Sequence, residues 1–195
     1  MRIIMNLKMQ FIRVFILFCI MSVIVINVKS QLINVSNTLL LETDHTGGKY
    51  GAGVSFADFN GDDIDDLTFG HHDGHIRFYE GYHDSTGSGF QEVMLSISNL
   101  QSEVKMVLWA DIDNDGDQDL FVSNRFSSNK IWRNNGNMEF TDFTSESGIS
   151  LTPETKSYGA SFGDYDNDGF LDLYICNYHT YVINFENELY HNNGD

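Results

Sequence analysis

The chain has 195 residues, of which 28 are acidic and 11 are lysine or arginine, so its formal net charge is −17. Nucleic acids and anionic membrane surfaces bind basic patches, and this charge balance argues against both as partners. We therefore expect no nucleic-acid partner.

The first 30 residues differ in kind from the rest of the chain. Three basic residues are followed by an almost unbroken apolar run over residues 14–26, and then by Val28-Lys29-Ser30. A small or β-branched residue at the −3 and −1 positions of a cleavage site is typical of a secretory signal peptide. The apolar run is shorter than the ~20 residues of a membrane-spanning helix. The sequence thus predicts a signal peptide over 1–30 and a secreted chain with no stable membrane span, the alternative being an uncleaved membrane anchor.

Removal of this leader makes the mature chain more acidic. The leader carries four of the 11 basic residues and no acidic residue, which leaves 7 basic and 28 acidic residues, a formal charge of −21. It also carries Cys19, so Cys176 would be the only cysteine and no intrachain disulfide could form. Because Cys176 lies in an apolar run, we expect a buried, inert thiol.

The segment 31–50 is a lead into the repeats and carries weak signals. Residues 32–35 and 39–41 could form strands, and residues 34–36 are an N-glycosylation sequon. Residues 43–53 are rich in glycine and polar residues, which predicts a loop.

Three acidic stretches recur at a spacing of 53 residues, beginning at Asp58, Asp111 and Asp164. In each, the first, fifth and ninth positions are aspartate, the third is aspartate or asparagine, and the tenth is leucine. The three nine-residue windows hold 14 of the 28 acidic residues. Such a period indicates a repeat architecture, and oxygen-rich loops suit a hard cation such as calcium. An acidic turn would explain one copy, but three copies in register favour a metal.

Short apolar runs flank each acidic stretch and predict strands. First strands are expected at 54–57, 107–110 and 160–163, and second strands at 67–70, 120–123 and 173–176. Third strands are expected at 129–136 and 187–194, and more loosely at 77–81, with fourth strands at 90–93 and 140–143. Four short strands per repeat describe a β-propeller blade better than a sandwich.

The expected fold is therefore all-β. It is a partial β-propeller of about three four-stranded blades preceded by a signal peptide. The blades are expected at about 51–103, 104–156 and 157–195, and the third is incomplete. Three repeats do not close a ring of 4–8 blades, so we expect the chain to be the N-terminal part of a longer protein.

These motifs resemble the FG-GAP/VCBS-type repeat of calcium-binding β-propellers. The stretch 131–136, followed by Phe140-Thr141-Asp142-Phe143-Thr144 and Ser147-Gly148-Ile149, is most similar to the cartilage acidic protein (ASPIC/UnbV) group. The resemblance covers about 51–195. It implies calcium in the loop between the first two strands of each blade.

The resemblance also implies the ligands of up to three calcium ions. Positions one, three, five and nine would supply side-chain oxygens, and position seven its backbone carbonyl. The implied ligands are Asp58, Asn60, Asp62, Ile64 and Asp66 in the first loop; Asp111, Asp113, Asp115, Asp117 and Asp119 in the second; and Asp164, Asp166, Asp168, Phe170 and Asp172 in the third. An EF-hand is excluded, because its position-12 glutamate would fall on Phe69, Val122 and Ile175.

Motifs for transition-metal binding or catalysis are few in this sequence. His71-His72-Asp73-Gly74-His75 could ligate a transition metal or form a polar turn between two strands. No catalytic serine, zinc-protease or Cys–His motif occurs. We interpret the chain as a non-enzymatic, secreted, calcium-binding module for extracellular interaction or adhesion, with a protein or glycan as partner. The alternative is the scaffold of a propeller enzyme acting on extracellular polysaccharide, with its active site outside this chain.

The sixth position predicts a ranking of the three sites. It is glycine in the second and third loops but Asp63 in the first, and aspartate adopts left-handed backbone less easily than glycine. We expect the first site to bind calcium most weakly. Isothermal titration calorimetry on chains with one intact loop, the other two disabled by aspartate-to-alanine changes at position one, would measure each affinity. Equal affinities in the three chains would refute the ranking.

Overall fold

The computed structural model describes residues 32–36, 38, 39, 41, 53–98, 100, 102–152, 156–178 and 185–194. The chain divides into two compact units, Met1–Asn37 and Thr38–Asp195. In the first unit the described residues 32–36 contain no strand, so the strand expected there is absent, and the expected signal peptide lies outside the described residues. Within the described ranges, no helix has the length and apolar character needed to cross a membrane.

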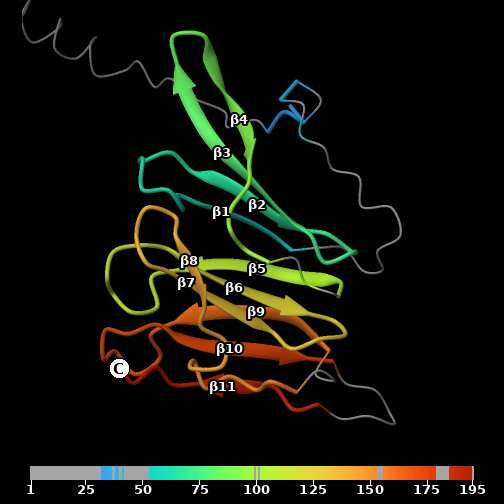
Figure 1. Cartoon of the computed structure of the whole chain (residues 1–195), viewed down its shortest axis with the longest axis vertical. Helices are drawn as coiled ribbons and strands as arrows, with labels where there is room; N and C mark the ends of the chain where they lie inside the picture. The colour runs from blue at the N-terminus through green and yellow to red at the C-terminus, as the bar shows by residue number, and fades with distance from the viewer. Residues whose placement is uncertain are drawn as a thin grey trace, which may run out of the picture. The chain divides into compact units, whose positions relative to one another are not determined.

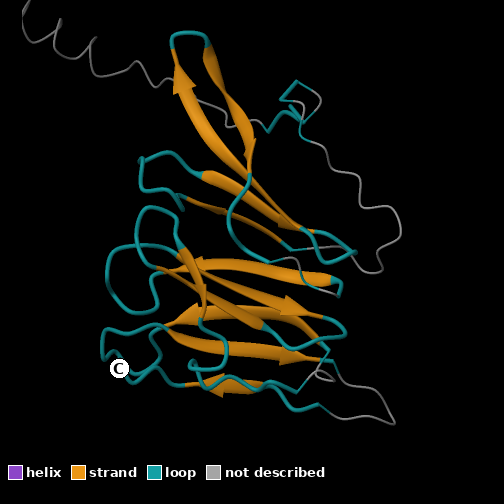
Figure 2. Ribbon diagram, viewed as in Figure 1, coloured by secondary structure: helices purple, strands orange, loops and turns teal. Residues whose placement is uncertain are grey.

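The described part of the second unit consists of strands and loops (Figures 1 and 2). The first sheet contains β1 (Val54–Ala57), β2 (Asp66–Gly70), β3 (Ile76–Asp84) and β4 (Gly87–Val93). The second contains β5 (Val104–Ala110), β6 (Asp119–Asn124), β7 (Lys130–Asn134) and β8 (Phe140–Asp142). The third contains β9 (Ser157–Gly163), β10 (Asp172–Asn177) and β11 (Glu188–Tyr190).

Each sheet is an antiparallel meander whose strands follow chain order. Each repeat therefore forms one sheet, and each acidic loop joins the first strand of its sheet to the second. The predicted all-β fold of a partial propeller, with two four-stranded blades and a third that is shorter, is confirmed.

The leucine at the tenth position of each repeat occupies the same place in all three sheets. Leu120 of β6 pairs with Trp109 on one side and Trp132 on the other. Leu67 and Leu173 likewise lie between an aromatic residue of the first strand and one of the third. All three leucines are buried. The residue that ends the acidic motif is thus also the first core residue of the second strand.

The second sheet is buried on both faces. Because alternate residues of a strand point to opposite faces, β6 sends Leu120 and Val122 into one apolar cluster and Phe121 into another. The first cluster includes Phe59 and Phe78 of the first repeat. The second includes residues of β10 in the third repeat. These two clusters join neighbouring sheets into one unit.

Cys176 is exposed, so the prediction of a buried thiol was wrong. Along β10, Leu173 and Ile175 pack in the cluster with Phe121, whereas Tyr174 and Cys176 point to the opposite face and are exposed. An apolar run alone does not show whether one or both faces of its strand are covered.

The two interfaces between sheets are filled differently. In the first, the Trp109 indole stacks on Phe59 with ring centroids 5.1 Å apart, and Phe78 and Phe140 pack around it. The same repeat positions in the second interface hold the smaller pair Phe162 and Ile112. A cavity of about 260 Å³, lined by both residues, lies there.

Filling this cavity should stabilise the fold. The double change Ile112→Phe with Phe162→Trp copies the aromatic pair of the first interface, and cavity-filling changes commonly add about 0.5–2 kcal/mol to the unfolding free energy. Urea unfolding followed by circular dichroism would measure the gain. Leu151→Phe, at an exposed residue, adds apolar volume outside the cavity and should change nothing. A less stable double variant would show that the aromatic pair does not fit.

Candidate metal centres

The aspartate at position one closes each acidic loop through its backbone. Asp111 accepts hydrogen bonds from the N–H groups of Asp115 and Gly116, each at 3.0 Å. Asp58 and Asp164 accept bonds from the fifth and sixth residues of their own loops in the same way. A carboxylate that is anchored by two N–H donors keeps a fixed orientation, with lone pairs left for a further ligand.

Positions four and six adopt the left-handed backbone that makes this closure possible. At position six, φ is 97° in Gly116, 96° in Gly169 and 67° in Asp63, so the first loop has the predicted left-handed aspartate. Position four, which the sequence reasoning missed, also has positive φ, at Gly61, Asn114 and Asn167. Glycine and asparagine are the residues that adopt this region most readily. The presence of only these two residue types at position four could therefore have predicted the left-handed backbone there.

The aspartate at position nine is buried and joins its loop to the third strand. Asp119 is 1% exposed. Its Oδ2 accepts the N–H of Ile112 at 2.9 Å, and its Oδ1 accepts the N–H of Asn134 at 2.8 Å. Asp66 forms an equivalent pair of bonds with Phe59 and with Gly81 of β3, and Asp172 with Tyr165 and with Asn192, just after β11. The ninth carboxylate therefore has a structural role that does not depend on a metal.

Burial makes two of these carboxyl groups weaker acids than an ordinary aspartate. It raises the pKa of Asp66 and of Asp119 to about 6, against the opposing effect of the N–H donors. The pKa of Asp172 is lowered instead, chiefly by the backbone N–H of Asn192 and also by His191. A raised pKa means that the ionised form is disfavoured where it lies, and a nearby cation would favour it.

Carboxylates at positions one, three and five converge in two of the loops. Oxygens of Asp111, Asp113 and Asp115 lie within 4.8 Å of one another, as do those of Asp164, Asp166 and Asp168. The first loop has Asn60 at position three, which exchanges hydrogen bonds with Asp62. At position seven, Ile64, Asp117 and Phe170 each donate their N–H to the fifth aspartate at 2.9 Å. Their carbonyl groups remain predicted ligands.

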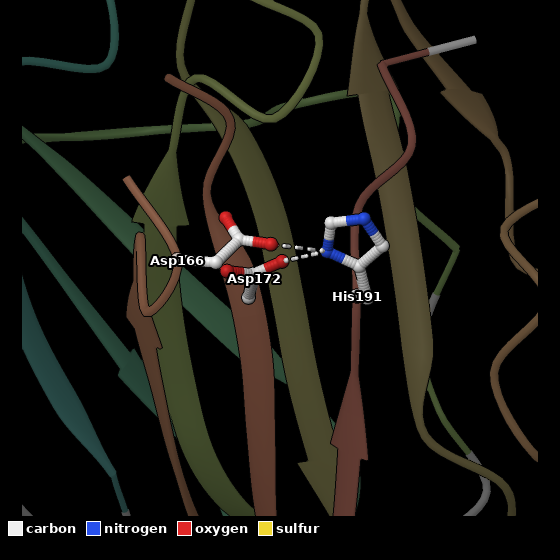
Figure 3. A group of neighbouring side chains, drawn as sticks. All are labelled: Asp166, Asp172 and His191. Carbon is white, nitrogen blue, oxygen red and sulfur yellow. Dashed lines mark hydrogen bonds and ion pairs between the residues drawn. The ribbon is translucent and has the colours of Figure 1, made fainter. Parts of the chain in front are cut away.

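A side chain from the third strand or just after it lies beside the second loop and another beside the third. Arg133 of β7 places Nε 3.2 Å from Asp113 Oδ2. His191, which follows β11, places Nδ1 3.1 Å from Asp172 and 3.5 Å from Asp166 (Figure 3). The counterpart in the first sheet is Glu80, since it follows the tyrosine that pairs with Leu67. Sequence reasoning missed these neighbours, although the alignment of the third strands contained them.

The second loop holds a carboxylate oxygen without a partner. Asp113 Oδ1 is buried and forms no hydrogen bond, while its Oδ2 lies beside Arg133. A buried polar atom without a partner costs free energy, and a cation in the loop would satisfy it. The available donors are carboxylate, amide and carbonyl oxygens, which suit calcium. The residues present therefore fit this ion.

The histidine-rich turn between β2 and β3 is organised around Asp73. Its Oδ1 lies 2.7 Å from His71 Nδ1 and 2.8 Å from His75 Nδ1. Burial opposes ionisation of Asp73, but the hydrogen bonds from His75 and His71 outweigh it and lower the pKa. Of the two readings of this segment, the polar turn describes the geometry, and these residues are not among the ligand groups that converge in the described ranges.

Comparison with known proteins adds independent findings. The sequence model of the FG-GAP-like repeat matches residues 58–122 and 111–175. Cartilage acidic protein 1 of Homo sapiens is 30% identical over 135 residues, which cover 65% of this chain and 20% of that protein. The Xenopus tropicalis protein of that name is 29% identical over 134 residues, 65% of this chain and 21% of its own length. The Mus musculus protein is 28% identical over 155 residues, 73% of this chain and 24% of its own length. The matched region is thus only about a fifth to a quarter of each relative.

The structural role of the ninth aspartate can be separated from metal binding. Asp119→Ala leaves the buried N–H groups of Ile112 and Asn134 without an acceptor, and each orphaned donor costs about 1–3 kcal/mol. We expect urea unfolding in excess chelator to show a loss of this order. Asp117→Ala, in the same loop, removes a side chain for which no hydrogen bond is found in the described residues and is the matched control. Equal losses in the two variants would contradict this role.

Proposed function

The chain belongs to the FG-GAP-like repeat family, and from that premise we propose that it is a secreted propeller module, stabilised by calcium, that serves in extracellular interaction or adhesion rather than catalysis. The observation that carries this proposal is the repeated loop itself. In two of the three loops, carboxylates at positions one, three and five converge, and one buried carboxylate oxygen lacks a partner.

The proposed ligands are the side chains of positions one, three, five and nine and the carbonyl of position seven in each loop. When bound, calcium supplies positive charge and coordination to oxygens that repel one another in its absence. Three ions would reduce the formal charge of the mature chain from −21 to −15. Because the loops are assembled only in the folded chain, binding would contribute directly to folding stability.

An extracellular location is supported by the relatives and by the leader. The relatives are named cartilage acidic protein 1, a name that places them in cartilage and describes their charge. The present chain is also strongly acidic and begins with a predicted signal peptide. We propose an extracellular protein or glycan as the partner, and acidity favours a basic surface on that partner.

The hydrogen bonds that the acidic side chains already accept within their own blades support a non-catalytic role. General acid–base catalysis needs a carboxyl group within reach of substrate. In each loop, however, the first and ninth aspartates accept backbone N–H groups of their own blade. The alternative of an enzyme scaffold has no specific observation in its favour among the described residues.

Calcium should raise the thermal stability of the chain. Ligand binding to the folded state adds RT ln(1 + [L]/Kd) per site, about 2.7 kcal/mol at a hundredfold excess over Kd. We expect a higher unfolding midpoint in millimolar calcium than in chelator, measured by circular dichroism. The triple variant Asp62→Asn, Asp115→Asn and Asp168→Asn should lose this shift, because it removes one ligand charge from each site and keeps an oxygen that accepts the N–H of position seven.

A matched triple variant controls for the loss of negative charge. Asp65→Asn, Asp117→Asn and Glu92→Gln remove three charges from side chains that are not proposed ligands. This chain should keep the calcium shift. A midpoint that calcium leaves unchanged in the unmodified chain would contradict the proposed function.

A further inference from the structure

Two asparagine side chains link the second and third acidic loops to each other. Asn114, at position four of the second loop, donates from Nδ2 to the carbonyl of Gly169, at position six of the third loop, at 3.0 Å. Asn192, which follows β11, donates from Nδ2 to the carbonyl of Ile112, at position two of the second loop, at 2.8 Å. The two loops therefore share hydrogen bonds that cross between blades.

The bridge from Asn192 reaches the ninth aspartate of both loops. The N–H of Ile112 is held by Asp119 Oδ2, and the N–H of Asn192 is held by Asp172 Oδ1, each at 2.9 Å. Three hydrogen bonds, linked through the covalent frames of Ile112 and Asn192, thus connect Asp119 to Asp172. Both ends of this connection are proposed calcium ligands.

The bridge from Asn114 ends on Gly169, a residue of the third loop whose backbone N–H is hydrogen-bonded to Asp164, the first aspartate of that loop. Gly169 has φ of 96°, and its N–H is held by Asp164 Oδ2 at 3.1 Å. A cation that fixes Asp164 would also fix the peptide beside the acceptor of Asn114. When two sites order shared groups, the first ligand reduces the entropy that the second must lose, and binding becomes cooperative.

Neither bridge has an equivalent between the first and second loops. Gly61 stands where the second loop has Asn114, so no side chain extends toward the next blade. Asn134 is the counterpart of Asn192 in the second repeat. Both donate from Nδ2 to the eighth residue of their own loop, Gln118 at 3.4 Å and Leu171 at 3.2 Å, but only Asn192 also reaches the neighbouring loop. No hydrogen bond joins the loops 58–66 and 111–119, both of which the structure describes throughout.

We propose that the second and third loops bind calcium as a coupled pair through Asn114 and Asn192, and that the first loop binds independently. This inference rests on the proposed function, because it requires that the loops hold calcium. It assigns to the two asparagines a positioning role, since each acts on a site through the backbone of the neighbouring loop.

The test is the calcium affinity of the second loop when another loop is disabled. The affinity is read from the backbone amide signal of Gly116 in ¹H–¹⁵N NMR spectra of the full chain during a calcium titration. Disabling the third loop by Asp168→Asn should weaken binding at the second loop about fivefold or more, the lower end of typical coupling. Disabling the first loop by Asp62→Asn should leave it unchanged.

The asparagine bridge is tested by repeating the comparison in two backgrounds. In Asn114→Gly, which copies the first loop and suits the positive φ there, Asp168→Asn should affect the second loop less, because only the bridge from Asn192 remains. In Asn167→Gly, the matched change at position four of the third loop, the effect of Asp168→Asn should persist. Should Asn114→Gly fail to fold, Asn192→Ala removes the other bridge and is expected to reduce the same effect.

The outcomes separate this inference from the proposed function. If Gly116 responds to calcium and Asp168→Asn leaves its midpoint unchanged, the coupling is wrong and calcium binding stands. If the coupling persists at full strength in both Asn114→Gly and Asn192→Ala, the assignment of the bridge is wrong. If calcium moves no loop amide in the unmodified chain, the proposed function and the coupling fail together.

Discussion

The two hydrogen bonds of the ninth aspartate are the interaction on which each blade depends. Asp66, Asp119 and Asp172 are almost fully buried, and each connects the N–H of position two of its loop to an N–H in the third strand or just after it. The next residue is the leucine that enters the core between two aromatic side chains. A single Asp-Leu pair thus fixes the loop, the pairing of three strands and the first apolar contact of the second strand.

The same bonds explain why the blade and its acidic loop form one structural unit. The ninth carboxylate must remain inside whether or not a cation is present, and burial already raises the pKa of Asp66 and Asp119. Charges placed beside the loops differ, with Arg133 next to the second and His191 next to the third. The Arg133 guanidinium reduces the repulsion among the carboxylates of the second loop and would compete with a bound ion. The three loops are therefore similar in backbone and different in electrostatics.

Much of the fold follows from patterns that are local in sequence. The first strand was predicted at the residues that β1 occupies, and the acidic loops lie between first and second strands as expected. What the patterns missed depends on distant partners. The exposure of Cys176 depends on which face of β10 is covered. Arg133 reaches Asp113 only through the pairing of strands, and Asn114 meets a carbonyl 55 residues away in the chain. The sequence pattern of a repeat predicts the strands and loop within that repeat, whereas these contacts depend on how strands pair and how repeats pack against each other.

The proposal that all three loops bind calcium is tested most directly by the number of ions that the folded chain binds. Native mass spectrometry in calcium should show up to three ions per chain. Disabling the first aspartate of one loop, by Asp58→Ala, Asp111→Ala or Asp164→Ala, should remove one ion each time. A chain that carries no calcium above the magnesium control, or a count that none of the three substitutions lowers, would contradict the claim.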